Sequence, residues 1–341
     1  MESEMVNYRP LITLSLVWVV SLVSGCGSPS TMSYPKGTVT TFKVSTGVYS
    51  IALDNSGNLW VPCNYHPCYT ATELTASSGY LTQNSIQLTY QPYIVIVDGY
   101  NDVIFTPYSN DDNLQELPSG STSDNVIYLN TSPTYVAVMS NNILWTTNAA
   151  TNNVTVYYPS SNTYATYSPS LNNPEGIAID SNSNVWVANN KSNNVIKLSS
   201  SGTTLATISV GTSPNQIALD TSGNAWVTDY TSNDVREISG STNTVINTFS
   251  ISKNPQGIAI DSGNNVWVAS FNGNFITEIP YINGTYSSSN EKTFTVGNGP
   301  YQIAIDSQGN VFVANTTDQT ISEIVGVASP TKTPILQNPT P

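Results

Sequence analysis

The chain has 341 residues, with nine Lys plus Arg against 22 Asp plus Glu, and a formal net charge of −13. This length allows the core of one large domain or of two ordinary ones. Because phosphate-backbone binding needs clustered cations, the acidic composition argues against nucleic acid as a partner.

The N-terminal region contains an apolar run, LITLSLVWVVSLV, at residues 11–23. A membrane span needs about 20 residues, so this shorter run is typical of a signal peptide. The sequence that follows, Val23-Ser24-Gly25-Cys26, resembles the lipobox of bacterial lipoproteins. The resemblance implies that residues 1–25 are a cleaved signal peptide, that Cys26 is acylated, and that residues 26–37 are a linker. We therefore expect an exported protein, lipid-anchored at the outer membrane, in the periplasm or on the cell surface. An ordinary secretory signal or an uncleaved anchor is the alternative.

Two further cysteines, Cys63 and Cys68, flank the single histidine of the chain, His66. In an oxidising compartment such a close pair predicts a disulfide that closes a small loop. A metal site that includes His66 is the alternative, although three ligands within six residues is not a recognised zinc spacing.

One pattern recurs seven times, with NPEGIAIDSNSNVWVANN (173–190) and SPNQIALDTSGNAWVTDY (213–230) as its clearest copies. Adjacent copies are 40 to 45 residues apart when they are aligned on one position, occupied by Asp54, Asp98, Met139, Asp180, Asp220, Asp261 and Asp306. Six residues later, Trp, Ile or Phe is found at Trp60, Ile104, Trp145, Trp186, Trp226, Trp267 and Phe312. Each unit reads as four short strands without a helical pattern, and this combination indicates the blades of a β-propeller.

The two ends of the repeat region predict how the ring closes. The seventh unit stops after its third strand, at residues 320–326, and a Pro/Thr-rich stretch follows at 327–341. The missing fourth strand is supplied by TVTTFKVSTGV (38–48), which aligns with TLATISVGTSP (204–214). We therefore expect an all-β, seven-bladed propeller over residues 38–326, with the last blade closed by the N-terminal strand, and a disordered tail at 327–341.

The repeated Asp-x-x-Gly-Asn segment invites comparison with calcium loops, but it lacks the alternating ligands and the final Glu of an EF-hand. Asp and Asn side chains bond to nearby backbone, and Gly supplies positive φ. Because the Asp of this segment occurs in six of seven units, we interpret the segment as a structural turn.

Positions that vary between units gather on the opposite face, where first strands begin and second strands end. We predict a ligand-binding mouth there, with tyrosines for stacking and amides for hydrogen bonds; solvated loop residues without a ligand are the alternative. The candidate residues are Tyr49, Tyr93, Tyr135, Glu175, Asn189, Asn215, Gln216, Asp229, Gln256, Tyr301, Gln302 and Asn315.

The unit P-x-G-I-A-I-D-x-x-G-N-x-W-V resembles NHL-type repeats and those of virginiamycin B lyase, and residues 242–260 resemble YVTN repeats. The lyase resemblance implies a histidine base and a glutamate-bound magnesium. No position here matches them: His66 lies in an insertion, and Ala188-Asn189 and Thr228-Asp229 stand where Thr-Glu is usual. Gluconolactonase-like propellers imply a divalent ion in the channel mouth, for which Glu175 and Asp229, with Asn189 and Asn215, are the candidates.

We therefore expect a non-catalytic, monomeric binding module for a peptide, glycan or protein, without a cofactor. The alternative is a metal-dependent propeller enzyme, a lactonase-type hydrolase or a lyase, that uses Ca²⁺ or Mg²⁺.

Overall fold

The computed structural model describes residues 34–331, apart from 46, 64–66, 109–110 and 140. The chain divides into two units, residues 1–34 and 35–341. The expected signal peptide, Cys26 and His66 lie outside the described residues, as do residues 332–341 of the expected tail. None of the helices in the described part has the length and apolar character that a membrane span requires.

The described residues form seven four-stranded antiparallel sheets, which are the blades of the propeller. Blade one contains β2 (Ala52–Leu53), β3 (Leu59–Pro62), β4 (Thr70–Leu74) and β5 (Gln83–Gln87); blade two contains β6 (Pro92–Val97), β7 (Val103–Pro107), β8 (Asn113–Leu117) and β9 (Asn125–Tyr128); blade three contains β10 (Tyr135–Val138), β11 (Leu144–Asn148), β12 (Asn153–Tyr158) and β13 (Thr163–Tyr167). Blade four contains β14 (Pro174–Ile179), β15 (Val185–Asn189), β16 (Asn194–Leu198) and β17 (Thr204–Ser209); blade five contains β18 (Pro214–Leu219), β19 (Ala225–Asp229), β20 (Asp234–Ile238) and β21 (Val245–Ser250). Blade six contains β22 (Pro255–Ile260), β23 (Val266–Ser270), β24 (Phe275–Ile279) and β27 (Lys292–Thr295); blade seven contains β28 (Pro300–Ile305), β29 (Val311–Asn315), β30 (Thr320–Ile324) and β1 (Val39–Lys43). Short 3₁₀ turns occur at η1 (Ala76–Ser78), η2 (Asn190–Ser192) and η3 (Ser288–Asn290).

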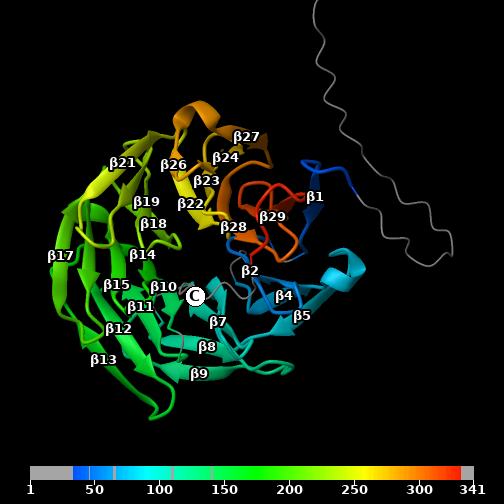
Figure 1. Ribbon diagram of the computed structural model, residues 1–341. Coiled ribbons are helices and arrows are strands. Elements are labelled where there is room, and N and C mark those ends of the chain that lie inside the picture. Colours follow the sequence, from blue (N-terminus) through cyan, green and yellow to red (C-terminus); the bar gives the residue numbers. More distant parts are fainter. Residues whose placement is uncertain (1–33, 46, 64–66, 109–110, 140, 332–341) are drawn as a thin grey trace, which may run out of the picture. The chain divides into compact units, whose positions relative to one another are not determined.

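The blades are arranged in a ring, with β10, β14 and β18 on the inside and β13, β17 and β21 on the outside (Figure 1). The outer strands are mostly exposed, whereas the second strands, such as Val185–Asn189, are buried throughout. The core lies between neighbouring blades: Ala178 and Trp186 of blade four pack in one cluster with Ile217 and Val227 of blade five. The predicted seven-bladed fold is confirmed.

The N-terminal strand closes the ring, as predicted. Strand β1 pairs with β30 in blade seven, from Val39 opposite Ile324 to Lys43 opposite Thr320. Residues 327–331, the first part of the expected tail, pack against the propeller: Ala328 is buried in the core of blades six and seven, and the Ser329 backbone N–H donates to Asp261 Oδ2 at 2.8 Å.

The repeated aspartates are turn residues, and they also have a role that the repeat pattern did not reveal. In blade five, Asp220 Oδ1 accepts the backbone N–H groups of Ser222 and Asn224, each at 2.9 Å. Its Oδ2 accepts the indole Nε1–H of Trp226 at 3.2 Å. The same indole contact, also at 3.2 Å, joins Trp60 to Asp54, Trp186 to Asp180 and Trp267 to Asp261. The carboxylate therefore ties the turn to the buried tryptophan of its own blade.

We expect Asp220→Asn to lower the free energy of unfolding by about 1–2 kcal/mol, because the amide cannot satisfy both the turn and the buried indole N–H. Asp306→Asn is the matched control, since Phe312 takes the tryptophan position in blade seven and has no N–H to leave unpaired. Urea unfolding measures both variants, and equal losses would show that the indole contact contributes nothing.

Blade six carries an insertion that the repeat pattern did not predict, a two-stranded ribbon of β25 (Tyr281–Ile282) and β26 (Thr285–Tyr286). Tyr286 packs edge-on against Trp226 with ring centroids 4.6 Å apart. Its hydroxyl donates to the Asn264 carbonyl at 3.0 Å. The insertion therefore covers part of the neighbouring blade five.

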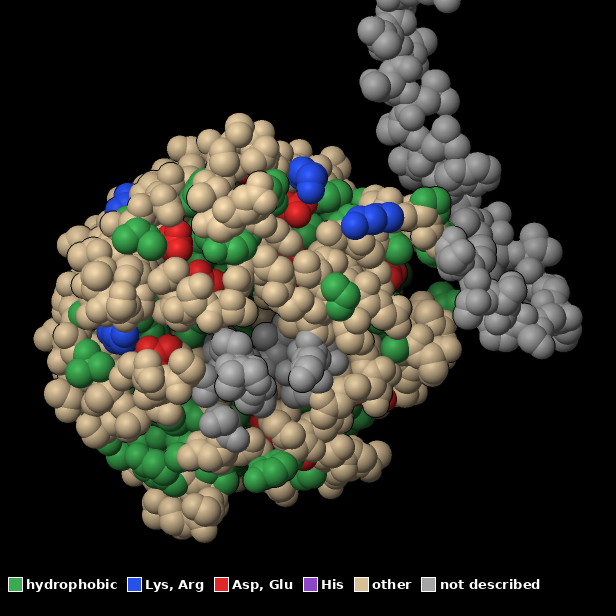
Figure 2. Space-filling view, in the orientation of Figure 1, with side chains coloured by type: hydrophobic (Ala, Val, Ile, Leu, Met, Phe, Trp, Pro, Cys, Tyr) green, Lys and Arg blue, Asp and Glu red, His purple; other side chains and the backbone are tan. Residues whose placement is uncertain are grey.

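Charged side chains are sparse on the face drawn in Figure 2, where uncharged polar side chains and backbone dominate. This agrees with a composition in which Asp, Glu, Lys and Arg make up 9% of the chain.

Candidate functional site

The predicted mouth begins at irregularities in the first strands. In five blades the register between the first and second strands shifts just after the initial proline, for example between Pro174 and Ile177. Such β-bulges re-aim side chains and are common beside functional sites. The shifted segments carry Tyr93, Glu175, Asn215, Gln216, Gln256, Tyr301 and Gln302.

Four predicted residues, Tyr49, Tyr93, Tyr135 and Tyr301, form one tyrosine cluster. The Tyr49 ring centroid lies 4.3 Å from that of Tyr93 and 4.5 Å from that of Tyr301. The hydroxyls of Tyr135 and Tyr301 are 2.7 Å apart, and Tyr93 donates to the hydroxyl of Tyr49. Each tyrosine lies in or just before the first strand of its blade, so the cluster joins the inner edges of blades seven, one, two and three.

The tyrosine cluster leaves fewer rings free to stack on a ligand than the sequence analysis expects. Tyr135 and Tyr301 are only 7% and 6% exposed, and their rings face other tyrosines. Tyr49 and Tyr93 are partly exposed, so these two are the aromatic residues that remain accessible to a ligand.

Glu175, in blade four, interacts electrostatically with the tyrosine cluster. Burial raises the pKa of Glu175, whereas the Asn173 Nδ2 group, which donates to Oε1 at 2.7 Å, opposes that rise. Burial also raises the pKa of Tyr49 and Tyr135, and the negative charge of Glu175 adds to both increases. The carboxylate and the tyrosines therefore share one partly desolvated environment.

Blades five and six carry buried polar atoms at the equivalent positions of their first strands. Asn215 Oδ1, Gln216 Nε2 and Gln256 Oε1 are buried and have no hydrogen-bond partner among the described residues. A buried polar atom without a partner costs about 1–3 kcal/mol. The two oxygens are acceptors, so this side of the site is suited to hydrogen-bond donors.

Gln302 has a different role. Its Oε1 accepts the backbone N–H of Ile51 at 3.3 Å, and it therefore joins blade seven to blade one.

The predicted mouth residues at the ends of the second strands are fully buried. Asn189, Asp229 and Asn315 are all 0% exposed. Asn189 Oδ1 accepts the Asn172 N–H at 2.6 Å, and Asp229 Oδ2 accepts the Gly211 N–H at 2.9 Å. Asn189 and Asp229 therefore hold the connection that enters their own blade from the preceding one, a role that a strand-end position did not reveal.

Gly211 explains how the connection comes so close. A Cβ atom at Gly211 would lie 2.7 Å from Asp229 Cβ, so only glycine permits this approach.

Buried Asp229 forms a carboxyl pair with Asp234, which is partly exposed. Arg236 Nε lies 3.3 Å from Asp229 Oδ2 and 3.2 Å from Asp234 Oδ1. Burial, followed by the neighbouring Asp234, raises the pKa of Asp229 to about 8, although the Gly211 N–H and Arg236 oppose the shift. One arginine cannot neutralise both carboxylates, so the pair retains a proton at neutral pH.

The described side chains do not fit the metal alternative. Within the described ranges, no group of three or more His, Cys, Asp or Glu side chains is close enough to hold a metal ion. Asp229 faces Arg236, and Glu175 receives an amide N–H from Asn173. Donor groups and a cation next to these carboxylates are unfavourable neighbours for Ca²⁺ or Mg²⁺.

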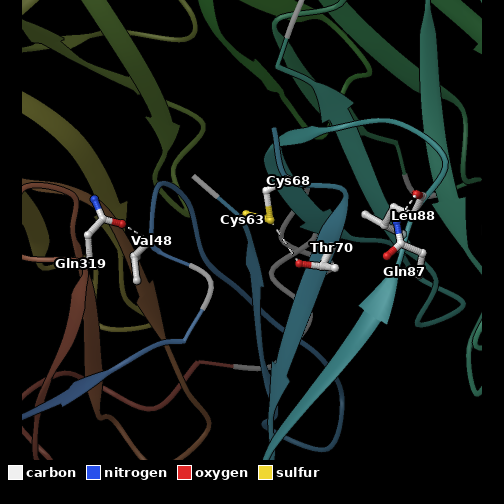
Figure 3. The surroundings of a disulfide bond; sticks show 7 residues. All are labelled: Val48, Cys63, Cys68, Thr70, Gln87, Leu88 and Gln319. Atoms are coloured by element: carbon white, nitrogen blue, oxygen red, sulfur yellow. Dashed lines mark hydrogen bonds between the residues drawn. A yellow bond between two sulfur atoms is a disulfide. The ribbon is translucent and has the colours of Figure 1, made fainter. Parts of the chain in front are cut away.

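Cys63 and Cys68 form a disulfide in blade one (Figure 3). Cys63 occupies the strand-end position that holds Asn189 and Asp229 in other blades, and Cys68 Sγ lies 3.3 Å from Thr70 Oγ1. Nearby, Gln319 Oε1 accepts the Val48 N–H at 2.6 Å, which links blade seven to the connection entering blade one. The disulfide therefore holds the end of β3 on the mouth side of blade one.

The fold is a seven-bladed propeller, and the first strands of its blades carry a tyrosine cluster and buried amide groups without partners among the described residues. The family model for the virginiamycin B lyase family matches residues 37–324, and the chain belongs to that family. Among curated proteins, no match was found.

Solved structures of similar fold include a streptogramin B lyase, at 17% identity and a TM-score of 0.73, covering 84% of this chain and 96% of the other. A catalytically inactive virginiamycin B lyase variant from Staphylococcus aureus with quinupristin has 15% identity and a TM-score of 0.72, covering 84% and 99%. Hydrazine synthase of Kuenenia stuttgartiensis has 13% identity and a TM-score of 0.72, covering 87% and 100%. At these identities the likeness concerns the fold alone.

Proposed function

We propose that this protein is a membrane-anchored, extracytoplasmic binding module that binds a peptide or glycan segment at the mouth of the propeller. The observation that carries the proposal is the set of bulged first strands in blades four, five and six, which carry Glu175, Asn215 and Gln256 at equivalent places. Asn215 Oδ1 and Gln256 Oε1 are buried acceptors without a partner among the described residues. Tyr49 and Tyr93 supply partly exposed aromatic rings. Acylated Cys26 would serve as the anchor.

The chemistry of the mouth favours a ligand that donates hydrogen bonds. Carboxylate and amide oxygens accept from hydroxyl, amide or ammonium groups, and aromatic rings pack against sugar faces and apolar side chains. A ligand of this kind would pair Asn215 Oδ1 and Gln256 Oε1, which are otherwise left without a partner in a buried place.

Binding to a glycan array and to a peptide library tests this function. We expect the double variant Asn215→Ala/Gln256→Ala to lose at least tenfold in affinity for the ligand identified, since two acceptors are removed. The control Asn182→Ala lies at the opposite face, in the β14–β15 turn, and should bind as the wild type does. Equal binding by the double variant and the control would contradict the proposed mouth.

Family membership supports one alternative, a lyase reaction at the same mouth. Incubation with quinupristin and Mg²⁺, followed by chromatography, distinguishes the two functions. We expect unchanged quinupristin, because the single histidine lies in the blade-one insertion and no family glutamate is matched. Ring opening that depends on the protein would overturn the non-catalytic proposal.

A further inference from the structure

A cavity lies away from the proposed mouth, between blades three and four. It has a volume of about 300 Å³ and is lined by Met139, Ile143, Trp145, Val156 and Tyr158, together with an asparagine and two serines. Met139 lies at the β10–β11 turn, and one of the serines at the β14–β15 turn. The cavity therefore opens at the face opposite the mouth and is independent of the proposed function.

Trp145, which lines the cavity, carries a buried donor without an acceptor. Trp145 is 0% exposed, and its indole Nε1–H has no hydrogen-bond partner among the described residues. In four other blades the equivalent indole donates to the repeated aspartate at 3.2 Å. In blade three that aspartate is replaced by Met139, whose thioether is at best a weak acceptor.

The replacement of the aspartate also removes hydrogen bonds within the turn. In blade four the carboxylate of Asp180 also accepts the backbone N–H groups of Asn182 and Asn184, and the Nδ2 group of Asn184. The positions that match Asp180 and Asn184 are Met139 and Ile143 in blade three, and both line the cavity. A carboxylate and an amide have thus been replaced by two apolar side chains around a remaining N–H donor.

The neighbouring Asn142 does not take the place of the missing aspartate. Its Nδ2 group donates to Asp98 Oδ2 of blade two, so its amide is committed to another blade. The cavity lining contains no Asp, Glu, Lys or Arg. Its volume is at the lower end of the range for small-molecule sites.

We propose that this cavity binds a small monocarboxylic acid with an apolar body, whose carboxylate takes the place of the missing aspartate at Trp145 Nε1. The apolar body lies against Met139, Ile143 and Val156. The turns of four other blades hold a carboxylate on the same indole contact, which is why we infer an acid and not a base.

A titration with 3-phenylpropionate tests the proposal, observed through the indole ¹⁵N–¹H resonances of the full-length protein. Trp145→Phe assigns the Trp145 signal. We expect that signal to move downfield with a dissociation constant of about 1 mM or below. Propylbenzene, which lacks an acceptor, should leave the signal unshifted.

Two substitutions at one position separate the role of the missing carboxylate from that of cavity shape. Met139→Asp should weaken 3-phenylpropionate binding at least tenfold, because it supplies the acceptor from within the chain. Met139→Leu keeps the apolar lining and should bind within about threefold of the wild type. Thermal melts establish that each variant is folded.

The proposal is overturned if the Trp145 resonance does not respond to about 10 mM acid, if propylbenzene shifts it equally, or if a folded Met139→Asp variant binds as tightly as the wild type.

Discussion

Removal of residues 38–44 should lower the melting temperature by at least about 10 °C and make the protein prone to aggregation. The segment contains β1, whose five residues pair with β30. Phe42 of β1 also stacks on Tyr80, which in turn packs edge-on against the fully buried Phe312. The deletion therefore removes both the outer strand and part of the aromatic core of blade seven.

The size of the effect follows from the hydrogen bonds and the packing that β1 provides. Each net backbone hydrogen bond contributes about 0.5–1.5 kcal/mol, and uncovering an aromatic ring adds a few kcal/mol. For a domain of this size about 1 kcal/mol corresponds to roughly 2–4 °C. Strand β30, which is otherwise paired on both sides, becomes an open edge, and open edges pair with other chains.

Differential scanning calorimetry measures the change in melting temperature, and two control samples are compared with the deletion variant. A chain that starts at residue 34 keeps β1 and should melt as the full chain does. A synthetic peptide of residues 37–45, added to the 38–44 deletion, should raise the melting temperature again by re-forming the β1–β30 pair. A deletion variant that melts with the wild type would mean that β1 does not close the ring.

The ring of blades could be predicted from the sequence because each blade repeats the same pattern of strands and turn. A short apolar first strand, a polar turn and a tryptophan-centred second strand recur with a nearly constant spacing. The closing strand was predictable for the same reason, since residues 38–48 match an ordinary fourth strand. The ribbon at β25–β26 was not, because an insertion has no counterpart in other blades.

The mouth could be predicted only in outline. Variation between blades identified the positions after each proline, and the structure brings four tyrosines among them together. Variation between blades does not indicate how deeply a residue is buried, however. Asn189, Asp229 and Asn315 occupy equivalent strand ends, and all three are fully buried.

The Trp145 cavity illustrates a signal that the sequence did contain. Met139 was visible as the one break in the series of aspartates. Its consequence required the structure, since only the four Asp–Trp contacts reveal what the tryptophan of blade three lacks.

The carboxyl pair of blade five predicts that the protein is more stable at pH 5 than at pH 8.5. Burial and Asp234 raise the pKa of Asp229 to about 8, whereas an aspartate in an unfolded chain titrates near 3.9. Between these two values the folded state binds more protons than the unfolded state, so stability falls as the pH rises. Burial also raises the pKa of Glu175 and of Glu323, and both contribute in the same direction.

One proton changes stability by at most about 1.4 kcal/mol per pH unit, so Asp229 accounts for about 2–4 kcal/mol between pH 5 and pH 8. We expect Asp229→Asn to flatten this dependence and to be the more stable protein at pH 8.5. The amide is neutral at both pH values, and its oxygen still accepts from Gly211. Arg236 is then left with one carboxylate, Asp234, as its partner.

Urea unfolding at pH 5.0 and pH 8.5 tests this expectation. Asn189→Ala, at the matching position of blade four, removes a buried side chain that does not titrate, and should lower stability equally at both pH values. If Asp229→Asn kept the wild-type slope, the proton would not reside on this pair, and the acid preference would have to come from other carboxyls whose pKa is raised by burial, such as Glu175, Glu237 and Glu323.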